Sequence, residues 1–518
     1  MGRWIRRSIF LLLIVEIVLA FSGVYNKLLE SHVISGFSWD GFRMFMSWFF
    51  AVYIFLIMTV IFFESRNPSK MIAWLLVLAV VPGVGFVLYI LFGRNIGKRR
   101  RSTKKKDADE NRMAYAANIQ KEIMKYVTYF DEMTSPVASR LSMLLLETSD
   151  APFLINNRVD ILTNGDETFS KILYALESAE HHIHLEYYII RDDKIGTEVK
   201  DVLIRKAKAG VEVRVLYDSV GCWKLSAKYV HDLRLAGVEL FPFFPVALPI
   251  LSRELNYRNH RKIIVVDGKV GFVGGLNIAD EYLGRSKQFG FWRDTHMVIW
   301  GEAVYGLQNT FLNDWNYVSK QAIQSEEFFP KQDHQGDTIV QIASSGPDSK
   351  WHSIEQAYFT MVSSAKSHVY VTTPYLVPEE SLITALKTAA LSGVDVRIVI
   401  PSKPDHFLVY WASQDNIEGL LEAGVRIFSY EKGFVHSKVI IVDSEVSTVG
   451  TANFDMRSFK INFEVNAFVY DADVARRLEN DFYQDIKDSR EILLEDHKER
   501  SIFKRFFESL GRLVSPLQ

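Results

Sequence analysis

The chain has 518 residues, and its 60 Lys and Arg almost balance its 62 Asp and Glu, which leaves a formal net charge of −2. This balance disfavours a globally basic nucleic-acid-binding protein, because such binding depends on a positive field. The only cysteine, Cys222, cannot form an internal disulfide or a cysteine metal cluster. A chain of this length accommodates roughly two to four domains of about 100–200 residues each.

Three apolar segments lie within the first hundred residues, at about 8–24, 44–63 and 71–92. The second and third carry no charge and are long enough to span a bilayer, which takes about 20 residues. The first contains Glu16 and follows three arginines, a pattern typical of either a retained span or a signal sequence. We therefore expect residues 1–93 to form a helical transmembrane region.

A basic cluster follows the third segment, with eight Lys and Arg between Arg94 and Lys106. The positive-inside rule places such a cluster in the cytoplasm, where it also attracts anionic headgroups. Three spans would leave the N-terminal arginines outside, against the same rule, whereas two spans would satisfy it. The sequence leaves both topologies open, and a plain solvated linker is the alternative for 98–106. We expect residues 94–150 to be a basic linker and helical connector.

The tail, residues 496–518, carries Ile, Phe, Leu and Val at helical spacing between basic residues. A basic amphipathic helix of this kind either lies in the membrane interface or docks onto the protein's own core. Both possibilities remain open. Together with the N-terminal segments, the tail favours a multi-pass membrane protein, and the charge rule places the part of the chain after the basic cluster on the cytoplasmic side.

From about residue 151 onward, two copies of one order of elements follow each other. S-A-E-H-H-I-H-L-E-Y-Y from Ser178 matches S-A-K-S-H-V-Y-V-T-T-P-Y from Ser364, and A-G-V-E-V-R-V-L from Ala209 matches S-G-V-D-V-R-I-V from Ser392. Short β-branched runs after helix-like stretches favour an α/β architecture with buried strands. Repeats of about 170 residues are domain-sized, so this is a duplication and not a solenoid. We expect the repeats at 151–340 and 341–495.

Each repeat ends in the same dense cluster. The first reads N-H-R-K-I-I-V-V-D-G-K-V-G-F-V-G-G-L-N and the second V-H-S-K-V-I-I-V-D-S-E-V-S-T-V-G-T-A-N. Strand alternation puts the His and Lys of each copy on one face. The matching residues are His260, Lys262, Asp267, Gly274 and Asn277 in the first copy and His436, Lys438, Asp443, Gly450 and Asn453 in the second.

These residue types suit chemistry on a phosphodiester. Imidazole transfers protons near neutral pH and can also attack phosphorus, while lysine supplies a positive charge for a phosphate oxygen. If the two sets meet, one His can attack and the other can protonate the leaving alcohol, and the resulting phosphohistidine is cleared by a second alcohol or by water. Lone strand histidines are usually structural, but the duplication argues against that here. The interleaved lysines and the lack of Cys or further clustered carboxylates argue against a metal site.

The paired H-x-K-x4-D-x6-G-x-x-N pattern resembles the phospholipase D superfamily. N-P-S-K-M-I-A-W-L-L-V from Asn67, V-V-P-G-V-G-F-V-L-Y-I-L-F-G-R from Val80 and F-P-F-F-P-V from Phe241 resemble bacterial cardiolipin synthases. The resemblance covers essentially the whole chain. It implies duplicated α-β-α sandwich repeats with a pseudo-twofold active site. It also implies the joining of two phosphatidylglycerols into cardiolipin with release of glycerol, without a metal or other cofactor.

The resemblance also implies roles for individual residues. His260 becomes the nucleophile and His436 the general acid and base, while a carboxylate on the strand after each motif orients the histidine. Asp267 and Asp443, although part of the catalytic motif, are expected to brace the strand and loop. The implied phosphate ligands are Lys262, Lys438, Asn277 and Asn453, and the implied orienting carboxylates are Asp294 and Glu464.

The two copies differ where Arg261 faces Ser437 and where Gly275 faces Thr451, so the half-sites are not equivalent. The runs 241–251 and 406–411 are candidates for an acyl-chain channel, with an ordinary buried loop as the alternative. The expected partners are phosphatidylglycerol, cardiolipin and the bilayer, with no nucleic acid. A phospholipase D-type hydrolase, or a transferase using another lipid alcohol such as phosphatidylethanolamine, is the competing enzyme, and a nuclease or an inactive membrane scaffold is a more distant alternative.

Overall fold

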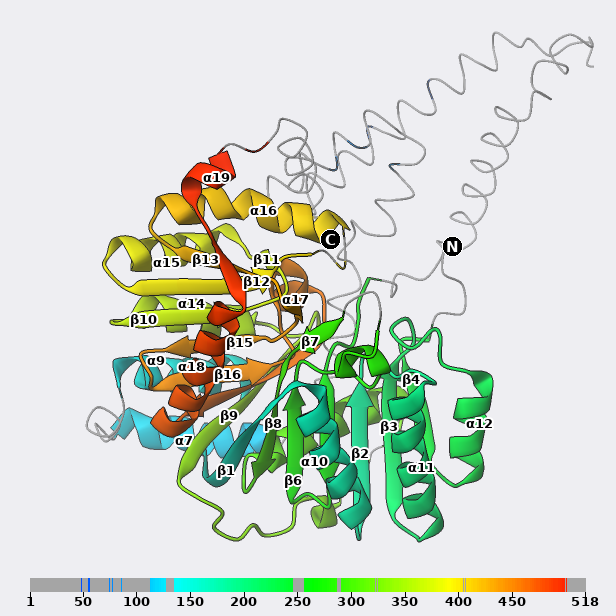
Figure 1. Ribbon diagram of the computed structural model, residues 1–518. Helices are drawn as coiled ribbons and strands as arrows, with labels where there is room; N and C mark the ends of the chain where they lie inside the picture. Colours follow the sequence, from blue (N-terminus) through cyan, green and yellow to red (C-terminus); the bar gives the residue numbers. More distant parts are fainter. Residues whose placement is uncertain are drawn as a thin grey trace, which may run out of the picture. The chain divides into compact units, whose positions relative to one another are not determined.

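A computed structural model of the chain is shown in Figure 1. It describes residues 112–126, 135–245, 256–286, 290–321, 323, 325–403, 405, 407–498 and 500, together with Trp48, Phe55, Trp74, Val77 and Gly85. The chain divides into two compact units, Met1–Arg94 and Asn95–Gln518. Apart from those five residues, the expected membrane segments lie outside the described residues, as do the basic cluster after Arg94 and the tail beyond Arg500. Among the residues described, no helix has the length and apolar character needed to cross a membrane.

Within the described residues, the part of the second unit up to residue 328 starts with α7 and α9 and continues as the first repeat. Its elements are α7 (Arg112–Tyr126), α9 (Pro136–Ser149), β1 (Leu154–Thr163), α10 (Asn164–Ser178), β2 (His182–Tyr187), α11 (Lys194–Lys208), β3 (Glu212–Asp218), α12 (Ala227–Leu235), β4 (Glu239–Phe243), β5 (Lys262–Val266), β6 (Val270–Gly274), η3 (Asp280–Leu283), β7 (Phe291–Arg293), β8 (Thr295–Trp300), α13 (Val304–Ser319) and η4 (Glu326–Phe328).

The second repeat follows the same order with small additions. Its elements are β9 (Thr338–Ser345), α14 (Ser353–Ser364), β10 (His368–Thr372), β11 (Leu376–Val377), α15 (Glu380–Leu391), β12 (Asp395–Pro401), α16 (Phe407–Glu422), β13 (Arg426–Tyr430), β14 (Gly433–Val435), β15 (Val439–Val442), β16 (Val446–Gly450), β17 (Phe454–Asp455), α17 (Met456–Lys460), β18 (Glu464–Tyr470), α18 (Ala472–Lys487), β19 (Ser489–Ile492) and α19 (Leu494–Lys498).

Both repeats contribute to one mixed sheet of 15 strands. The first half runs β4-β3-β2-β5-β6-β8-β1, and the second half runs β9-β18-β16-β15-β10-β12-β13, with β19 at the outer edge. In each half three strands are parallel (β2, β3 and β4; β10, β12 and β13), and the motif strand pairs antiparallel with the first of them. The halves join where β1 and β9 pair antiparallel. The two halves are therefore mirrored in strand order, as a duplication predicts.

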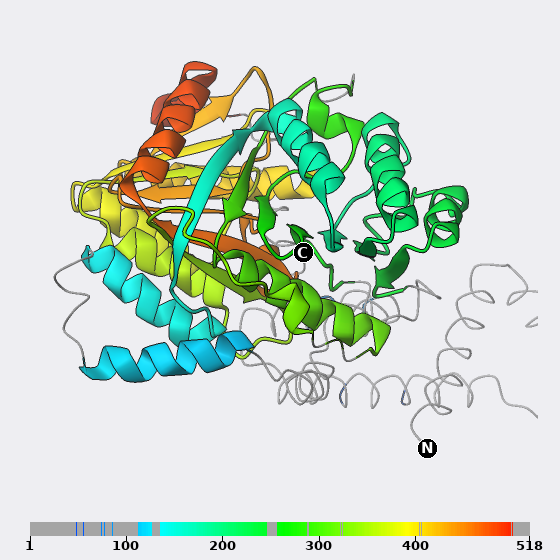
Figure 2. The ribbon, with the colours of Figure 1, turned by 90° about the horizontal axis from the view of Figure 1, so that it is seen from below.

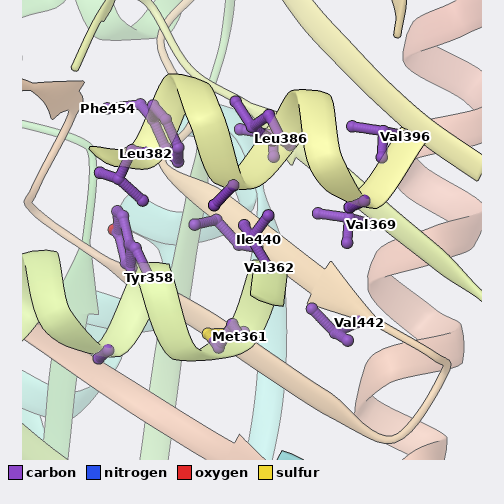
Figure 3. Packing of buried hydrophobic residues seen from close by; sticks show 14 of the residues in the cluster. Tyr358, Met361, Val362, Val369, Leu382, Leu386, Val396, Ile440, Val442 and Phe454 are labelled. Carbon is purple, nitrogen blue, oxygen red and sulfur yellow. The ribbon is translucent and has the colours of Figure 1, made fainter. Parts of the chain in front are cut away.

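The motif strands are buried on both faces, which explains why the residues after Lys262 in one and all residues of the other are apolar instead of alternating with polar ones. K-I-I-V-V forms β5 and V-I-I-V forms β15, and every residue in both is buried. Figures 1 and 2 show α10, α11 and α12 side by side along the first repeat. Figure 3 shows Met361 of α14 and Leu386 of α15 near Ile440 of β15 in the core of the second repeat. A third core cluster combines apolar side chains of both repeats, including Ile263 and Ile441.

Asp267 and Asp443 lie at the far ends of the motif strands from the histidines. At about 3.4 Å per strand residue, roughly 20 Å of chain separates each from the motif His. The Asp267 carboxylate accepts hydrogen bonds from three successive backbone amides, of Glu180, His181 and His182, at 2.8–2.9 Å. Asp443 does the same for residues 366–368 at 2.7–2.9 Å. These contacts fix the turn before β2 and β10 and leave the carboxylates away from the reacting atoms.

Replacing Asp267 by Asn tests this bracing. Asn tolerates the left-handed backbone at this position (φ 53°) but removes the charge that three amides share. Hydrogen bonds to charged groups contribute about 1.5–3 kcal/mol, so we expect Asp267→Asn to lower the free energy of unfolding by about that amount. Urea unfolding measures it, with the fully exposed Asp337→Asn as the control. Equal stability of the two variants would contradict the bracing role.

Candidate active site

Two short parallel pairings between the repeats bring the motifs together. β14 pairs with β7, so that Val435 lies opposite Arg293. At the equivalent place in the other half, Asn259 forms a parallel bridge with Phe463. The motif histidines follow directly, and their backbone amides donate across the repeats: His436 N–H to the Arg293 carbonyl at 2.7 Å, and His260 N–H to the Phe463 carbonyl at 2.9 Å. Each motif histidine is thus held by a backbone segment of the opposite repeat.

Each histidine also takes its orienting carboxylate from the opposite repeat. His260 Nδ1 lies 3.0 Å from both carboxylate oxygens of Glu464, and His436 Nδ1 lies 2.7 Å from Oδ2 of Asp294. Both carboxylates are fully buried. A buried carboxylate on Nδ1 favours the tautomer with the proton on Nδ1 and leaves Nε2 with its lone pair. The structure thus joins the residues chosen from the sequence, in a crossed arrangement that the sequence did not predict.

Burial and charge set the protonation of these pairs. Burial lowers the pKa of His260 to about 4, against the opposing effect of Glu464, and burial together with the Lys438 charge lowers the pKa of His436 to about 4. Burial alone would raise the pKa of Asp294 and Glu464, but the neighbouring histidine and lysine charges outweigh it and the pKa of each is lowered. At neutral pH both carboxylates are therefore ionised and both imidazoles are neutral.

The two lysines lie beside their histidines and are almost completely buried. Lys262 Nζ donates to the His260 carbonyl at 2.7 Å, and Lys438 Nζ lies 2.9 Å from His436 Nδ1 and also donates to the His436 carbonyl. Because Nδ1 of His436 donates its proton to Asp294, it has no lone pair left for Lys438, and the His436 carbonyl is the acceptor for that ammonium. Burial lowers the pKa of Lys262 to about 7 and of Lys438 to about 8.

The two asparagines are buried and make different contacts. Asn277 accepts from the Ile189 amide at 3.1 Å and donates to the Tyr282 hydroxyl at 2.6 Å. Asn453 donates to Asp455 at 3.2 Å, and its side-chain oxygen is buried with no partner among the described residues. No group of three His, Cys, Asp or Glu side chains suited to a metal ion occurs in the described part of the chain.

The matching positions of the two repeats hold Gly275 in the first and Thr451 in the second, and the neighbouring carboxylate explains each residue. A Cβ atom at position 275 would lie 2.0 Å from Oδ1 of Asp294, so only glycine lets this carboxylate approach. At the matching position the Thr451 hydroxyl donates to Glu464 at 2.6 Å. This difference between the repeats therefore fits Gly275 to Asp294 and Thr451 to Glu464.

Aromatic rings flank both histidines, and the sequence analysis did not single them out. The Tyr188 ring lies 5.0 Å from that of His260, between centroids, and the Trp292 ring lies 5.2 Å from that of His436. Trp292 immediately precedes the R-D pair of the carboxylate strand, which was a usable signal. Of the candidate acyl-chain runs, Phe243 and Phe244 are buried against Phe463, as in the buried-loop alternative, whereas residues 246–251 and His406 lie outside the described residues.

Comparisons with known proteins agree with the fold and the paired motifs. The family described as "Cardiolipin synthase, PLD-like domain" matches residues 172–315 and 358–486, and the family "Phospholipase_D-nuclease N-terminal" matches residues 51–94. A solved phosphatidylserine synthase from Haemophilus influenzae shares the fold with a TM-score of 0.57 at 15 % identity, covering 74 % of this chain and 99 % of that one. A mirrored α/β sheet with one His–Lys motif in each half thus defines a phospholipase D-like protein.

Closer relatives narrow this class. Cardiolipin synthase 2 of Bacillus cereus is 50 % identical over 473 residues, which is 90 % of either chain. The cardiolipin synthase of Geobacillus kaustophilus is 50 % identical over 466 residues, 90 % of this chain and 92 % of that one, and the major cardiolipin synthase of Bacillus subtilis is 42 % identical over 475 residues, 91 % and 98 %. The chain belongs to the cardiolipin synthases of the phospholipase D superfamily, which confirms the expected family and enzyme class.

The pKa values predict a bell-shaped dependence of kcat/KM on pH. On the acid side, activity should fall as pH drops toward about 4, where the His260 imidazole becomes protonated. On the alkaline side, activity should fall as pH rises through about 7 to 8, because Lys262 and Lys438 lose their charges. Initial rates in mixed micelles between pH 4 and 10 measure both limbs. A kcat/KM that still rises above pH 9 would contradict the lysine ionisation.

Proposed function

We propose that this cardiolipin synthase transfers a phosphatidyl group between two phosphatidylglycerol molecules through a phosphohistidine. The observation that supports this most is the pair of crossed dyads, in which both histidines use Nδ1 on a buried carboxylate. Among the hydrogen bonds and ion pairs of the described residues, those of the His260 and His436 side chains use Nδ1 and none uses Nε2. Each Nε2 is therefore available to the substrate, one for attack and the other for proton transfer.

In the first half-reaction, His260 Nε2 attacks the phosphorus of one phosphatidylglycerol. The P–O bond to the glycerol headgroup breaks, and the leaving oxygen takes a proton from Nε2 of His436. That proton requires a protonated His436, and a bound phosphodiester anion favours it because negative charge raises the pKa of a nearby imidazole. Lys262 and Lys438 neutralise the non-bridging oxygens, with Asn277 and Asn453 as further phosphate ligands.

In the second half-reaction, His436 removes the proton from the primary hydroxyl of the second phosphatidylglycerol. Its oxygen attacks phosphorus, the P–N bond breaks and the electron pair returns to His260. Cardiolipin leaves, and the same steps run backward with glycerol as the acceptor, so the reaction is reversible. No metal or nucleotide enters this scheme.

Transfer to a lipid alcohol competes with transfer to water. The rings of Tyr188 and Trp292 beside the histidines limit the space for water, and exclusion of water protects a reactive intermediate.

We propose that residues 1–93 anchor the enzyme in the membrane, with residues 94–150 as connector, 151–340 and 341–495 as repeats and 496–518 as an amphipathic segment. The basic cluster then faces the cytoplasm. This orientation is tested by adding protease to sealed cells, where Lys98–Lys106 should be protected from cleavage.

Product analysis tests the proposed reaction. Purified enzyme with phosphatidylglycerol labelled in its headgroup should release glycerol and form cardiolipin in equal amounts. His260→Ala and His436→Ala should each lower this rate by at least about 10³-fold, the scale set by removal of one member of a catalytic triad. His334→Ala, an exposed histidine, is the control and should keep full activity. Phosphatidic acid as the main product would instead indicate a hydrolase, and retained activity in both variants would exclude the paired histidines.

Trapping the intermediate tests the roles of the two histidines. Without the base at position 436, the second alcohol is not activated, so His436→Ala should accumulate a phosphatidyl adduct on His260 when given an activated phosphodiester whose leaving group needs no proton. Mass spectrometry of the digested protein locates the adduct. An adduct found on His436 in the His260→Ala variant, with none on His260 in the other, would reverse the assignment.

A further inference from the structure

A buried arginine lies behind each of the two orienting carboxylates. In the first half-site, Arg261 Nε donates to the backbone carbonyl of Glu464 at 3.2 Å, and its guanidinium forms an ion pair with Asp314 of α13. The Arg261 side chain is 5 % exposed and that of Asp314 is 0 % exposed. The guanidinium therefore links the backbone of Glu464 to a helix of the first repeat.

The second half-site contains the same link, built from different positions. Arg293 donates from a terminal nitrogen to the backbone carbonyl of Asp294 at 2.6 Å, and its Nε donates to Asp485 of α18 at 2.7 Å. These side chains are 6 % and 4 % exposed. In both half-sites, a guanidinium thus holds the carbonyl of the residue whose carboxylate orients the histidine.

The two aspartates occupy equivalent helix positions. L-Q-N-T-F-L-N-D from Leu307 in α13 aligns with L-E-N-D-F-Y-Q-D from Leu478 in α18, and Asp314 and Asp485 are the final residues of these runs. The leucine and phenylalanine of each run are buried in hydrophobic core. The anionic end of the link was therefore kept in both copies of the duplication.

The two arginines, by contrast, do not occupy equivalent positions in the two repeats. The counterpart of Arg261 is Ser437, and the counterpart of Arg293 is Phe463. The guanidinium of Arg261 lies over the Phe463 ring, 5.4 Å from its centroid, and Arg293 lies 3.3 Å from the Ser437 hydroxyl. Arg261 therefore contacts Phe463, which stands where the second half-site has Arg293. Arg293 in turn contacts Ser437, which stands where the first half-site has Arg261. The two sequence differences compensate each other in space.

We propose that the ion pair of Arg261 with Asp314 and the ion pair of Arg293 with Asp485 have the same function in the two half-sites. In each, the guanidinium keeps the orienting carboxylate at the correct position beside its histidine, although the arginine comes from a different segment of the repeat. This inference rests on the proposed function, because it assigns the arginines to the two histidine dyads. The arginines touch the carboxylate residues only through backbone and therefore act as positioning residues. Removing one leaves a buried aspartate without its cation and frees the strand that carries the carboxylate.

Moving the arginine from one strand to the other tests the proposal. Arg261→Ser alone should lower kcat by about 10²-fold with KM within about threefold, since a misplaced dyad affects the transition state and not lipid binding. The double variant Arg261→Ser/Phe463→Arg copies the arrangement of the second half-site into the first. It should recover kcat to within about tenfold of the unmodified enzyme.

Arg261→Ser/Phe463→Met is the matched control, because it loses the same aromatic ring without supplying a guanidinium. It should stay as slow as Arg261→Ser. Circular dichroism and thermal unfolding establish that each variant is folded. An arginine double variant that fails to fold, or that is no faster than the methionine double variant, overturns the inference. Loss of activity in His260→Ala and His436→Ala, measured in parallel, separates that failure from a failure of the proposed function.

Discussion

The crossed pairing of histidine and carboxylate is the constraint on which the rest of the structure depends. His260 relies on Glu464 and His436 relies on Asp294, so neither repeat contains a complete catalytic dyad. The antiparallel β1–β9 junction joins the two halves in one sheet, and the two short parallel pairings bring each histidine beside its carboxylate. The two repeats thus build one site together, because each supplies the histidine of one pair and the carboxylate of the other.

Electrostatics explain why such a buried polar cluster is tolerated and how it is used. The two carboxylates and the two lysines have opposite charges in a nearly dry environment, and both imidazoles are neutral when the site is empty. The low pKa values of Lys262 and Lys438 show the desolvation cost of this arrangement. A phosphodiester anion lowers that cost, because its charge offsets the lysines. In the proposed mechanism, binding of the phosphodiester and protonation of His436 are thereby coupled.

The sequence predicted the parts of the site that are encoded locally. The repeated motif with its spacing identified both histidines and both lysines, and the mirrored α/β architecture followed from the duplication. The crossing of the dyads was not predictable, because it depends on pairing between β7 and β14, which lie about 140 residues apart in the chain. Arg293 was missed for a related reason. Its counterpart, Phe463, is not an arginine, so comparison of the repeats did not show that each half-site has a guanidinium bound to the backbone of its carboxylate residue.

Nitrogen NMR of the two imidazoles tests the crossed pairing most directly. In enzyme labelled with ¹⁵N-histidine and assigned with the two alanine variants, Asp294→Asn should change the tautomer and the pKa of His436 and leave His260 nearly unchanged. Glu464→Gln should do the opposite. If Asp294→Asn instead perturbs His260 and leaves His436 unaltered, each carboxylate serves the histidine of its own repeat, and the crossed arrangement is contradicted.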